Sequence, residues 1–326
     1  MNSASSSCSI LSAAVAAISI TLIYTASTVD GISGLAVIDA PLLTQKIGTN
    51  RTIKVDINGN GDFTSVQAAI DSVPKGNNEW IIVHIRKGVY REKVHIPKDK
   101  PYIFMRGNGR GRSIIAWSQS SVDNVESATL RVEAPYFTAF GVSFKNDAPT
   151  GVAYTSQNQS VAAFVAADKV AFYHCAFYST HNTLFDYKGR HFYESCYIQG
   201  SVDFIFGRGR SVFQSCEIFV IDDKRLKIHG SITAQNRESD GDKSGFVFLK
   251  GKVYGTSDVY LGRAKDNDGF VIAVDSNIYQ AEFHCHGPGY DPSNRAPWVK
   301  QLTEEEAAPF MSIDFIDGAS WLPAWL

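Results

Sequence analysis

The sequence has few methionines and cysteines and no excess of either charge. Among its 326 residues are 3 Met and 5 Cys, and 31 Lys and Arg stand against 33 Asp and Glu, which leaves a net charge of -2. A nucleic-acid binder uses a basic excess to neutralise phosphates, so no nucleic-acid partner is expected. The hydrophobic content of 44% is ample for a core and argues against a disordered chain.

Several catalytic motifs are also absent. The chain has no G-x-S-x-G elbow, no G-x-x-x-x-G-K-[ST] loop and no H-E-x-x-H helix, which argues against serine hydrolases, P-loop proteins and zincins. No metal is expected at His284, Cys285 and His286, because neighbours in an extended chain point to opposite faces. The glycine-rich run GNGRGRS at 107–113 precedes no convincing helix, so we expect a turn there rather than a phosphate cradle.

The longest uncharged run lies near the start of the chain. Residues 10–26 carry no charge, and at about 17 residues the run is near the lower limit for spanning a bilayer. Small residues follow it, so residues 1–26 are expected to form a signal peptide, although the usual Lys or Arg before the run is missing. An uncleaved anchor is the alternative. Cleavage would leave an N-terminal segment at 27–50, a folded domain at 51–326 and a secreted protein.

Aromatic residues and glycines are plentiful, and the aromatic strands recur at a regular interval. The chain has 26 Gly, 20 Phe and 14 Tyr, a balance that favours strands joined by tight turns. The runs VAFYHCAF, HFYESCYI and SVFQSCEI begin at Val170, His191 and Ser211, and an earlier run, FTAFGVSF, begins at Phe137. Short alternating strands about 20 residues apart indicate a solenoid whose coils bury their inward residues on one another. We expect an all-β fold, a parallel β-helix in one domain.

The cysteines of these runs occupy equivalent positions. Stacked in a solenoid, they would pack as small hydrophobes. An oxidising compartment allows the alternative of up to two disulfides. The residues available for them are Cys175, Cys196, Cys216 and Cys285. Two N-x-[ST] sequons are candidates for glycosylation in the same compartment, those of Asn50 and Asn158.

Short helices are expected at both ends of the solenoid. In residues 62–73, Asp62 is the candidate N-cap, and four apolar residues share one helical face. They are Val66, Ala69, Ile70 and Val73. Near the C-terminus, Thr303 precedes Glu306 with the spacing of a capping box.

One carboxylate interrupts an apolar strand. Asp203 stands in VDFIFG at 202–207, which otherwise has the pattern of solenoid core. Burial raises the pKa of a carboxyl group, whereas a nearby arginine or hydrogen bond keeps it ionised, and this competition is typical of a nucleophile or general base. The alternative is an aspartate that stabilises a turn.

Six motifs follow one another along the chain. They are GVYRE at 88–92, QSVAA at 159–163, VDFIFG at 202–207, ITAQ at 232–235, YLGR at 260–263 and FIDGASWL at 315–322. Together they resemble plant pectin methylesterases, the carbohydrate esterases of cell walls, from about Thr52 to the C-terminus. The resemblance implies a right-handed parallel β-helix whose groove holds methyl-esterified homogalacturonan and cleaves it to a carboxylate and methanol, without a metal or another cofactor.

The resemblance also assigns roles to individual residues. Asp203 matches the nucleophile, which attacks the ester carbonyl and forms a covalent acyl intermediate. Gln159 matches the amide that stabilises the oxyanion, and Arg263 matches the arginine that orients the nucleophile and contacts the sugar acid. Thr129 and Phe206 fall at positions expected to touch the substrate.

The main departure from the family concerns its second catalytic aspartate. The family motif Gln-Asp-Thr-Leu-Tyr is HNTLF at 181–185 here, so Asn182 stands in place of that aspartate. An amide cannot exchange a catalytic proton as a carboxyl does, and Asn182 is retained only as a substrate contact. An imidazole titrates near neutral pH, so one hypothesis is that His181 partly replaces the carboxyl. The other is that His181 lines the groove with no proton role.

Two further departures affect the groove. Lys265 replaces the aromatic residue that follows the Leu-Gly-Arg motif, and it either favours a carboxylated galacturonate beside the cleaved ester or is simply solvated. The stretch from Lys265 to Phe283 is shorter than the resemblance leads us to expect, either naturally or through an error in gene prediction, and one groove wall would be reduced. Basic residues after Asp203 would concentrate a polyanion, unless they too are ordinary solvated surface. They are Arg208, Arg210, Lys224, Arg225 and Lys227.

We therefore expect a secreted, monomeric pectin methylesterase of the cell wall, with pectin as its substrate and a proteinaceous pectin methylesterase inhibitor as a further partner. Residues 27–50 leave no room for the inhibitor-like pro-region that some family members carry, so proteolytic activation is not expected. The competing hypothesis is a pectin-binding pseudoenzyme that has lost turnover through Asn182. A pectate lyase would need clustered carboxylates for Ca²⁺, and the sequence shows no such cluster.

Overall fold

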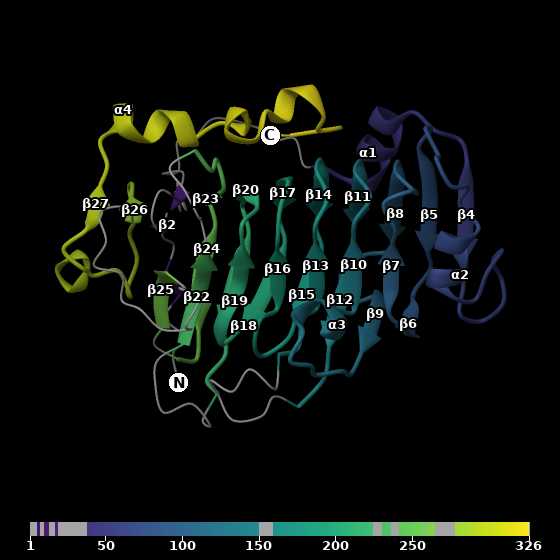
Figure 1. Cartoon of the computed structure of the whole chain (residues 1–326), viewed down its shortest axis with the longest axis horizontal. Helices are drawn as coiled ribbons and strands as arrows, with labels where there is room; N and C mark the ends of the chain where they lie inside the picture. Colours follow the sequence, from purple (N-terminus) through teal and green to yellow (C-terminus); the bar gives the residue numbers. More distant parts are fainter. Residues whose placement is uncertain are drawn as a thin grey trace.

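The computed structural model describes residues 5–6, 10–12, 17–18, 38–149, 159–223, 230–235, 241–257, 259–264 and 278–325. Figure 1 shows short strands stacked side by side along the length of the molecule, with the C-terminal helices lying across one side. None of the helices among these residues is long and apolar enough to cross a membrane.

Three sheets run along the molecule, and each coil of the chain adds one strand to each sheet. The first sheet contains β6 (Gly88–Arg91), β9 (Ser113–Trp117), β12 (Val142–Asn146), β15 (Ala176–Tyr178), β18 (Tyr197–Gly200), β21 (Glu217–Val220) and β24 (Lys252–Gly255). The second contains β7 (Val94–Ile96), β10 (Leu130–Val132), β13 (Ala163–Val165), β16 (Leu184–Asp186), β19 (Val202–Gly207), β22 (Gly230–Gln235) and β25 (Val259–Ala264).

The third sheet contains β4 (Thr52–Val55), β5 (Ile81–Ile85), β8 (Ile103–Gly107), β11 (Phe137–Phe140), β14 (Val170–Tyr173), β17 (Arg190–Glu194), β20 (Arg210–Gln214) and β23 (Gly245–Leu249). It continues through β2 (Ile10–Ser12), β26 (Ile278–Glu282) and β27 (Val299–Gln301). Two more short strands pair with these sheets. β3 (Ala17–Ile18) pairs with β26, and β1 (Ser5–Ser6) pairs with β24 at the end of the first sheet. Within each sheet, most neighbouring parallel strands are three apart in chain order, because each coil adds one strand to each of the three sheets. This arrangement is a right-handed parallel β-helix, which confirms the predicted fold class.

The repeat seen in the sequence corresponds to one bend of each coil. Each run supplies a strand of the third sheet and then a strand of the first, and the residue between them has a left-handed backbone. This residue is His174, Ser195 or Ser215, with φ of 50°, 50° and 53°. The bend turns the chain onto the next sheet, so equivalent residues of successive coils stack.

The cysteines follow these bends and point into the core. All four cysteines in the described ranges are buried free thiols. Burial raises the pKa of Cys175 and Cys196 well above the ordinary value. The expectation that they pack as small hydrophobes is therefore confirmed, and the disulfide alternative is wrong for this structure.

Short helices lie against the outside of the coil. They are α1 (Ala40–Ile47), α2 (Val66–Asp71), α3 (Asn124–Ser127) and α4 (Glu304–Ala307), with 3-10 turns η1 (Pro292–Asn294), η2 (Ala308–Phe310), η3 (Ile313–Ile316) and η4 (Gly318–Ser320). The predicted helical face of α2 is buried, but its N-cap is Ser65, because Asp62 instead accepts a hydrogen bond from the Lys54 amide at 2.7 Å. The predicted capping box of Thr303 and Glu306 is present in α4.

Candidate active site

The second sheet carries a row of aromatic rings on its outer face. Phe164, Phe185 and Phe206 are register neighbours on β13, β16 and β19. Their ring centroids lie 5.1 and 4.3 Å apart, and the last two rings are stacked. Tyr187 is 37% exposed and stacks 5.7 Å from Phe164, which extends the row toward solvent. Aromatic faces of this kind offer an apolar surface to a sugar ring.

Asp203 lies at an irregularity of β19. The register between β19 and β22 shifts between Val202 and Ile205, and Asp203 itself has a left-handed backbone with φ of 47°. Such conformations are uncommon outside glycine and cluster at functional sites, and a bulge redirects the side chain. Asp203 is 6% exposed, and the Ser231 hydroxyl on β22 donates a hydrogen bond to its Oδ1.

His181 and Asn182 lie against the strand that carries Asp203. His181 forms an isolated parallel bridge with Val202, and the backbone N–H of Asn182 donates to the Val202 carbonyl at 3.3 Å. Asn182 also has a left-handed backbone, with φ of 56°, a conformation that asparagine tolerates better than most residues. Both residues therefore sit beside the backbone of the candidate nucleophile.

A second carboxylate approaches the histidine. Nε2 of His181 lies 3.2 Å from Oδ2 of Asp223, and both residues are more than nine-tenths buried. An ionised carboxylate at this distance attracts a protonated imidazole. Whether His181 carries a proton or only lines the groove stays a prediction.

The side chain of Asn182 is held by the helix that precedes Thr129. Its Nδ2 donates to Oδ1 of Asn124, the first residue of α3, at 3.2 Å. Thr129 is fully buried, and its hydroxyl donates to the Lys145 carbonyl at 3.0 Å. In this conformation Thr129 presents no exposed atom. Its contact with substrate therefore stays a prediction, and it would require the residues that bury Thr129 to move.

Gln159 lies four residues before the start of β13. Its backbone forms an antiparallel bridge with Ser121, and the next residue, Ser160, donates to the His181 carbonyl at 3.4 Å. Within the described ranges, Oε1 of Gln159 is buried without a hydrogen-bond partner. A buried amide oxygen without a hydrogen bond costs free energy, and a hydrogen bond between this amide and a bound ligand would remove that cost. Exchanging the amide oxygen and nitrogen places an N–H donor at the same point.

The remaining predicted residues are only partly described. The backbone of Arg263 on β25 is the register neighbour of Ala234, which in turn neighbours Phe206, so position 263 lies in line with the strand positions of the aromatic row. Its side chain and the whole of Lys265 lie outside the described residues. Arg208 and Arg210 pair with Asp242 and Asp317, which reduces their attraction for a polyanion, and Lys224, Arg225 and Lys227 also lie outside the described residues.

Sequence reasoning missed three residues of this site. Asp223, Ser231 and Asn124 contact His181, Asp203 and Asn182 across 42, 28 and 58 residues of chain. Ser231 directly precedes the ITAQ motif, which was the one available signal for it. The other two contacts depend on long-range packing that no local pattern encodes.

Three comparisons identify the family of the chain. The family described as Pectinesterase matches residues 52–270. Probable pectinesterase 67 of Arabidopsis thaliana is 62% identical over 309 residues, which cover 88% of this chain and 90% of the relative. Probable pectinesterase 8 of the same plant is 36% identical over 84% of this chain and 77% of its own length. The solved pectin methylesterase from carrot has 29% identity and a TM-score of 0.73 over 84% of this chain and 95% of its own. The chain belongs to the pectinesterase family of carboxylic ester hydrolases.

Proposed function

We propose that this protein hydrolyses the methyl esters of pectin in the cell wall, with Asp203 as its nucleophile. The observation that carries this proposal is the placement of a buried carboxylate at a bulge, held by Ser231 and flanked by His181 and Asn182. The family of the chain supplies the reaction class, and the site supplies the group that performs it. We expect the protein to act as a secreted monomer.

The chemistry divides into two steps. First, a carboxylate oxygen of Asp203 attacks the ester carbonyl, and the negative charge moves to the carbonyl oxygen, where the amide of Gln159 stabilises it. Collapse of this intermediate breaks the bond to the methoxy group. Protonated His181 gives its proton to that group, which leaves as methanol.

In the second step, water hydrolyses the acyl intermediate. Neutral His181 takes a proton from the attacking water, and the bond to Asp203 breaks, which restores the Asp203 carboxylate and the protonated His181. The product leaves as a sugar carboxylic acid, which loses its proton to the solvent and becomes a carboxylate. Asp223 acts as a positioning residue in both steps, since its carboxylate lies 3.2 Å from Nε2 of His181. Asn182, held by Asn124, contacts the substrate rather than carrying the proton.

Methanol release from esterified pectin tests the proposal. We expect release by the parent protein, a loss on the order of 10³-fold or more in Asp203→Ala, and a loss of about 10²-fold in His181→Ala. Full activity in Asp203→Ala contradicts the aspartyl mechanism, and full activity in His181→Ala contradicts the proton role of the histidine.

The alternative function, a pectin-binding pseudoenzyme, is favoured by the amide at position 182. It predicts that the parent protein releases no methanol although it binds pectin. The Asn182→Asp variant distinguishes the two functions. If this variant gains activity that the parent lacks, the pseudoenzyme is the correct description.

A further inference from the structure

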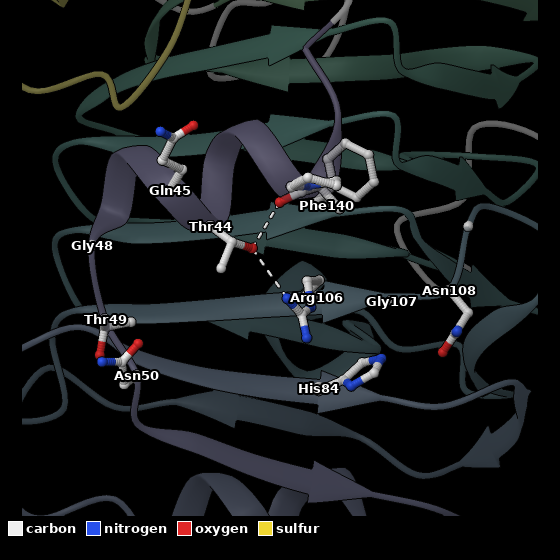
Figure 2. A pocket seen from close by; sticks show the side chains of 13 residues that line it. Thr44, Gln45, Gly48, Thr49, Asn50, His84, Arg106, Gly107, Asn108 and Phe140 are labelled. Carbon is white, nitrogen blue, oxygen red and sulfur yellow. Dashed lines mark hydrogen bonds between the residues drawn. The ribbon is translucent and has the colours of Figure 1, made fainter.

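A cavity of about 870 Å³ lies on the outer face of the third sheet, whereas the candidate active site lies on the second. Its floor is formed by His84, Arg106 and Phe140, register neighbours on β5, β8 and β11. Helix α1 and the residues after it form one wall, as Figure 2 shows. The cavity is within the range of about 300–1,000 Å³ that is typical of small-molecule sites.

The charge inside this cavity is not neutralised. Nη1 of Arg106 donates to the Thr44 hydroxyl at 3.1 Å, and none of the residues lining the cavity is an aspartate or a glutamate. Arg106 is half-buried, and burial lowers the pKa of its guanidinium, which is the sign of a desolvated cation.

The other arginine side chains that the structure describes either pair with a carboxylate or are exposed to water. The following seven pair with a carboxylate: Arg86, Arg110, Arg131, Arg190, Arg208, Arg210 and Arg295. Arg51, Arg91 and Arg112 are exposed to water, which solvates their charge. Among the arginine side chains that the structure describes, Arg106 thus differs in being half-buried with a hydroxyl, and no carboxylate, as its partner. An anion bound in the cavity would supply the missing negative charge.

The other lining groups narrow the chemistry of that anion. A guanidinium presents a planar fork that fits a carboxylate. The amides of Gln45, Asn50 and Asn108 line the same cavity, and amides both donate to and accept from sugar hydroxyls. The Phe140 ring adds an apolar face on the floor. One cation, several amides and an aromatic face suit a ring that carries one carboxylate and several hydroxyls.

We propose that this cavity is a second, non-catalytic binding site for a uronic acid unit of a de-esterified pectic chain, with the sugar carboxylate on Arg106. This inference rests on the proposed function for the identity of the sugar acid, because the reaction yields a chain of such carboxylates. A site that holds the product on another face keeps the enzyme on a chain that it has begun to de-esterify, through a raised effective concentration.

Calorimetric titration with trigalacturonate tests the site. The full chain is produced in a bacterial host, so that no glycan is attached at Asn50, which lines the cavity and lies in a sequon. We expect two binding events in the parent protein and the loss of one in Arg106→Gln, with at least a tenfold weakening of that event. Arg110→Gln is the matched control, since it removes the same charge from a pair with Glu217 on another face. It should retain both events.

Two further titrations decide the chemistry of the ligand. The neutral trisaccharide maltotriose should not bind the cavity, and inorganic phosphate should bind more weakly than trigalacturonate. A single binding event in the parent, unchanged in Arg106→Gln, overturns the inference. So does an Arg106-dependent event seen with phosphate alone, which would assign the cavity to a free anion.

The failure of this inference is separable from failure of the proposed function. Arg106→Gln should release methanol from esterified short oligomers at the parent rate, because Arg106 lies outside the candidate active site. A parent protein that releases no methanol contradicts the proposed function whatever the titration shows.

Discussion

Asp222 and Asp223 are adjacent carboxylates with opposite surroundings, and they provide a matched pair for testing the histidine. Asp223 is buried and lies 3.2 Å from Nε2 of His181, whereas Asp222 is exposed. Asp223→Asn should lower kcat by about 10-fold to 100-fold and leave KM nearly unchanged, because the carboxylate orients a proton carrier without touching the sugar.

The pH profile separates this role from a structural one. Loss of the negative charge destabilises the protonated imidazole, so the limb of the kcat profile that reports His181 should move to lower pH in Asp223→Asn. Asp222→Asn should leave both the rate and the profile unchanged. A rate loss in Asp223→Asn with an unshifted profile would mean that the residue only supports the fold.

Glu194 is a buried carboxyl that the proposed reaction does not use. It ends β17, is 2% exposed, and within the described ranges its Oε2 has no hydrogen-bond partner. Burial raises the pKa of Glu194 from 4.5 to about 7. Between pH 4.5 and about pH 7, Glu194 is therefore protonated in the native state but ionised in the unfolded chain. The free energy of unfolding falls as the pH rises through this window.

Replacing this carboxyl should remove the pH dependence. We expect Glu194→Gln to be more stable than the parent above pH 7, by roughly 3 kcal/mol at most, since each unit of pKa shift corresponds to about 1.4 kcal/mol. At about pH 5, where the parent carboxyl is largely protonated, the difference should be small. Urea unfolding at both pH values measures it, with the exposed Glu305→Gln as control. Equal pH slopes for the parent and Glu194→Gln contradict this account.

Among the elements, β16 is joined to later coils by a carboxylate inside the solenoid. Asp186 is fully buried, accepts from the Tyr193 hydroxyl at 2.7 Å and from the Ser211 hydroxyl at 2.8 Å, and lies 3.0 Å from Nδ1 of His191. Burial alone would lower the pKa of His191, but the charge and hydrogen bond of Asp186, together with the hydrogen bond to the Ala167 carbonyl, raise it. Three donors on β17 and β20 thus converge on one acceptor on β16.

Loss of this acceptor should be among the most costly single changes in the fold. Asp186→Val, which copies its register neighbour Val165 on β13, fills the space but leaves the three donors unpaired. We expect a loss of about 3–5 kcal/mol in the free energy of unfolding, measured in urea. The exposed Asp222→Val should change it by less than about 0.5 kcal/mol. A loss below about 1 kcal/mol in Asp186→Val would mean that the donors find other partners.

The sequence was most informative about the elements and least about their partners. The spacing of Cys175, Cys196 and Cys216 predicted the coil, because every coil repeats the same bend and the same inward position. Asp186 occupies an inward position in the same repeat, yet nothing local names Ser211 as its partner. Ser231 and Asp223 near the candidate nucleophile and its neighbour were missed for the same reason, since their contacts form only when coils stack.

For the whole molecule, the buried cysteines provide a measure of how the solenoid opens. In a stack where each coil contacts only its neighbours, the ends open at lower free energy than the middle. Cys175 and Cys196 lie in central coils and are fully buried, whereas Cys285 lies toward the C-terminal end and is 9% exposed. Among the four described thiols, a reagent should therefore label Cys285 first, and the central thiols only at the rate or population of global unfolding.

Mass spectrometry of the native protein, sampled over time with Ellman's reagent, gives the order of labelling. Because no disulfide stabilises the described fold, the melting temperature should be the same with and without reductant. A melting temperature that falls in reductant would mean that two of these cysteines pair in solution. Labelling of Cys175 before Cys285 would mean that the coil opens from its centre, against the nearest-neighbour behaviour expected of a solenoid.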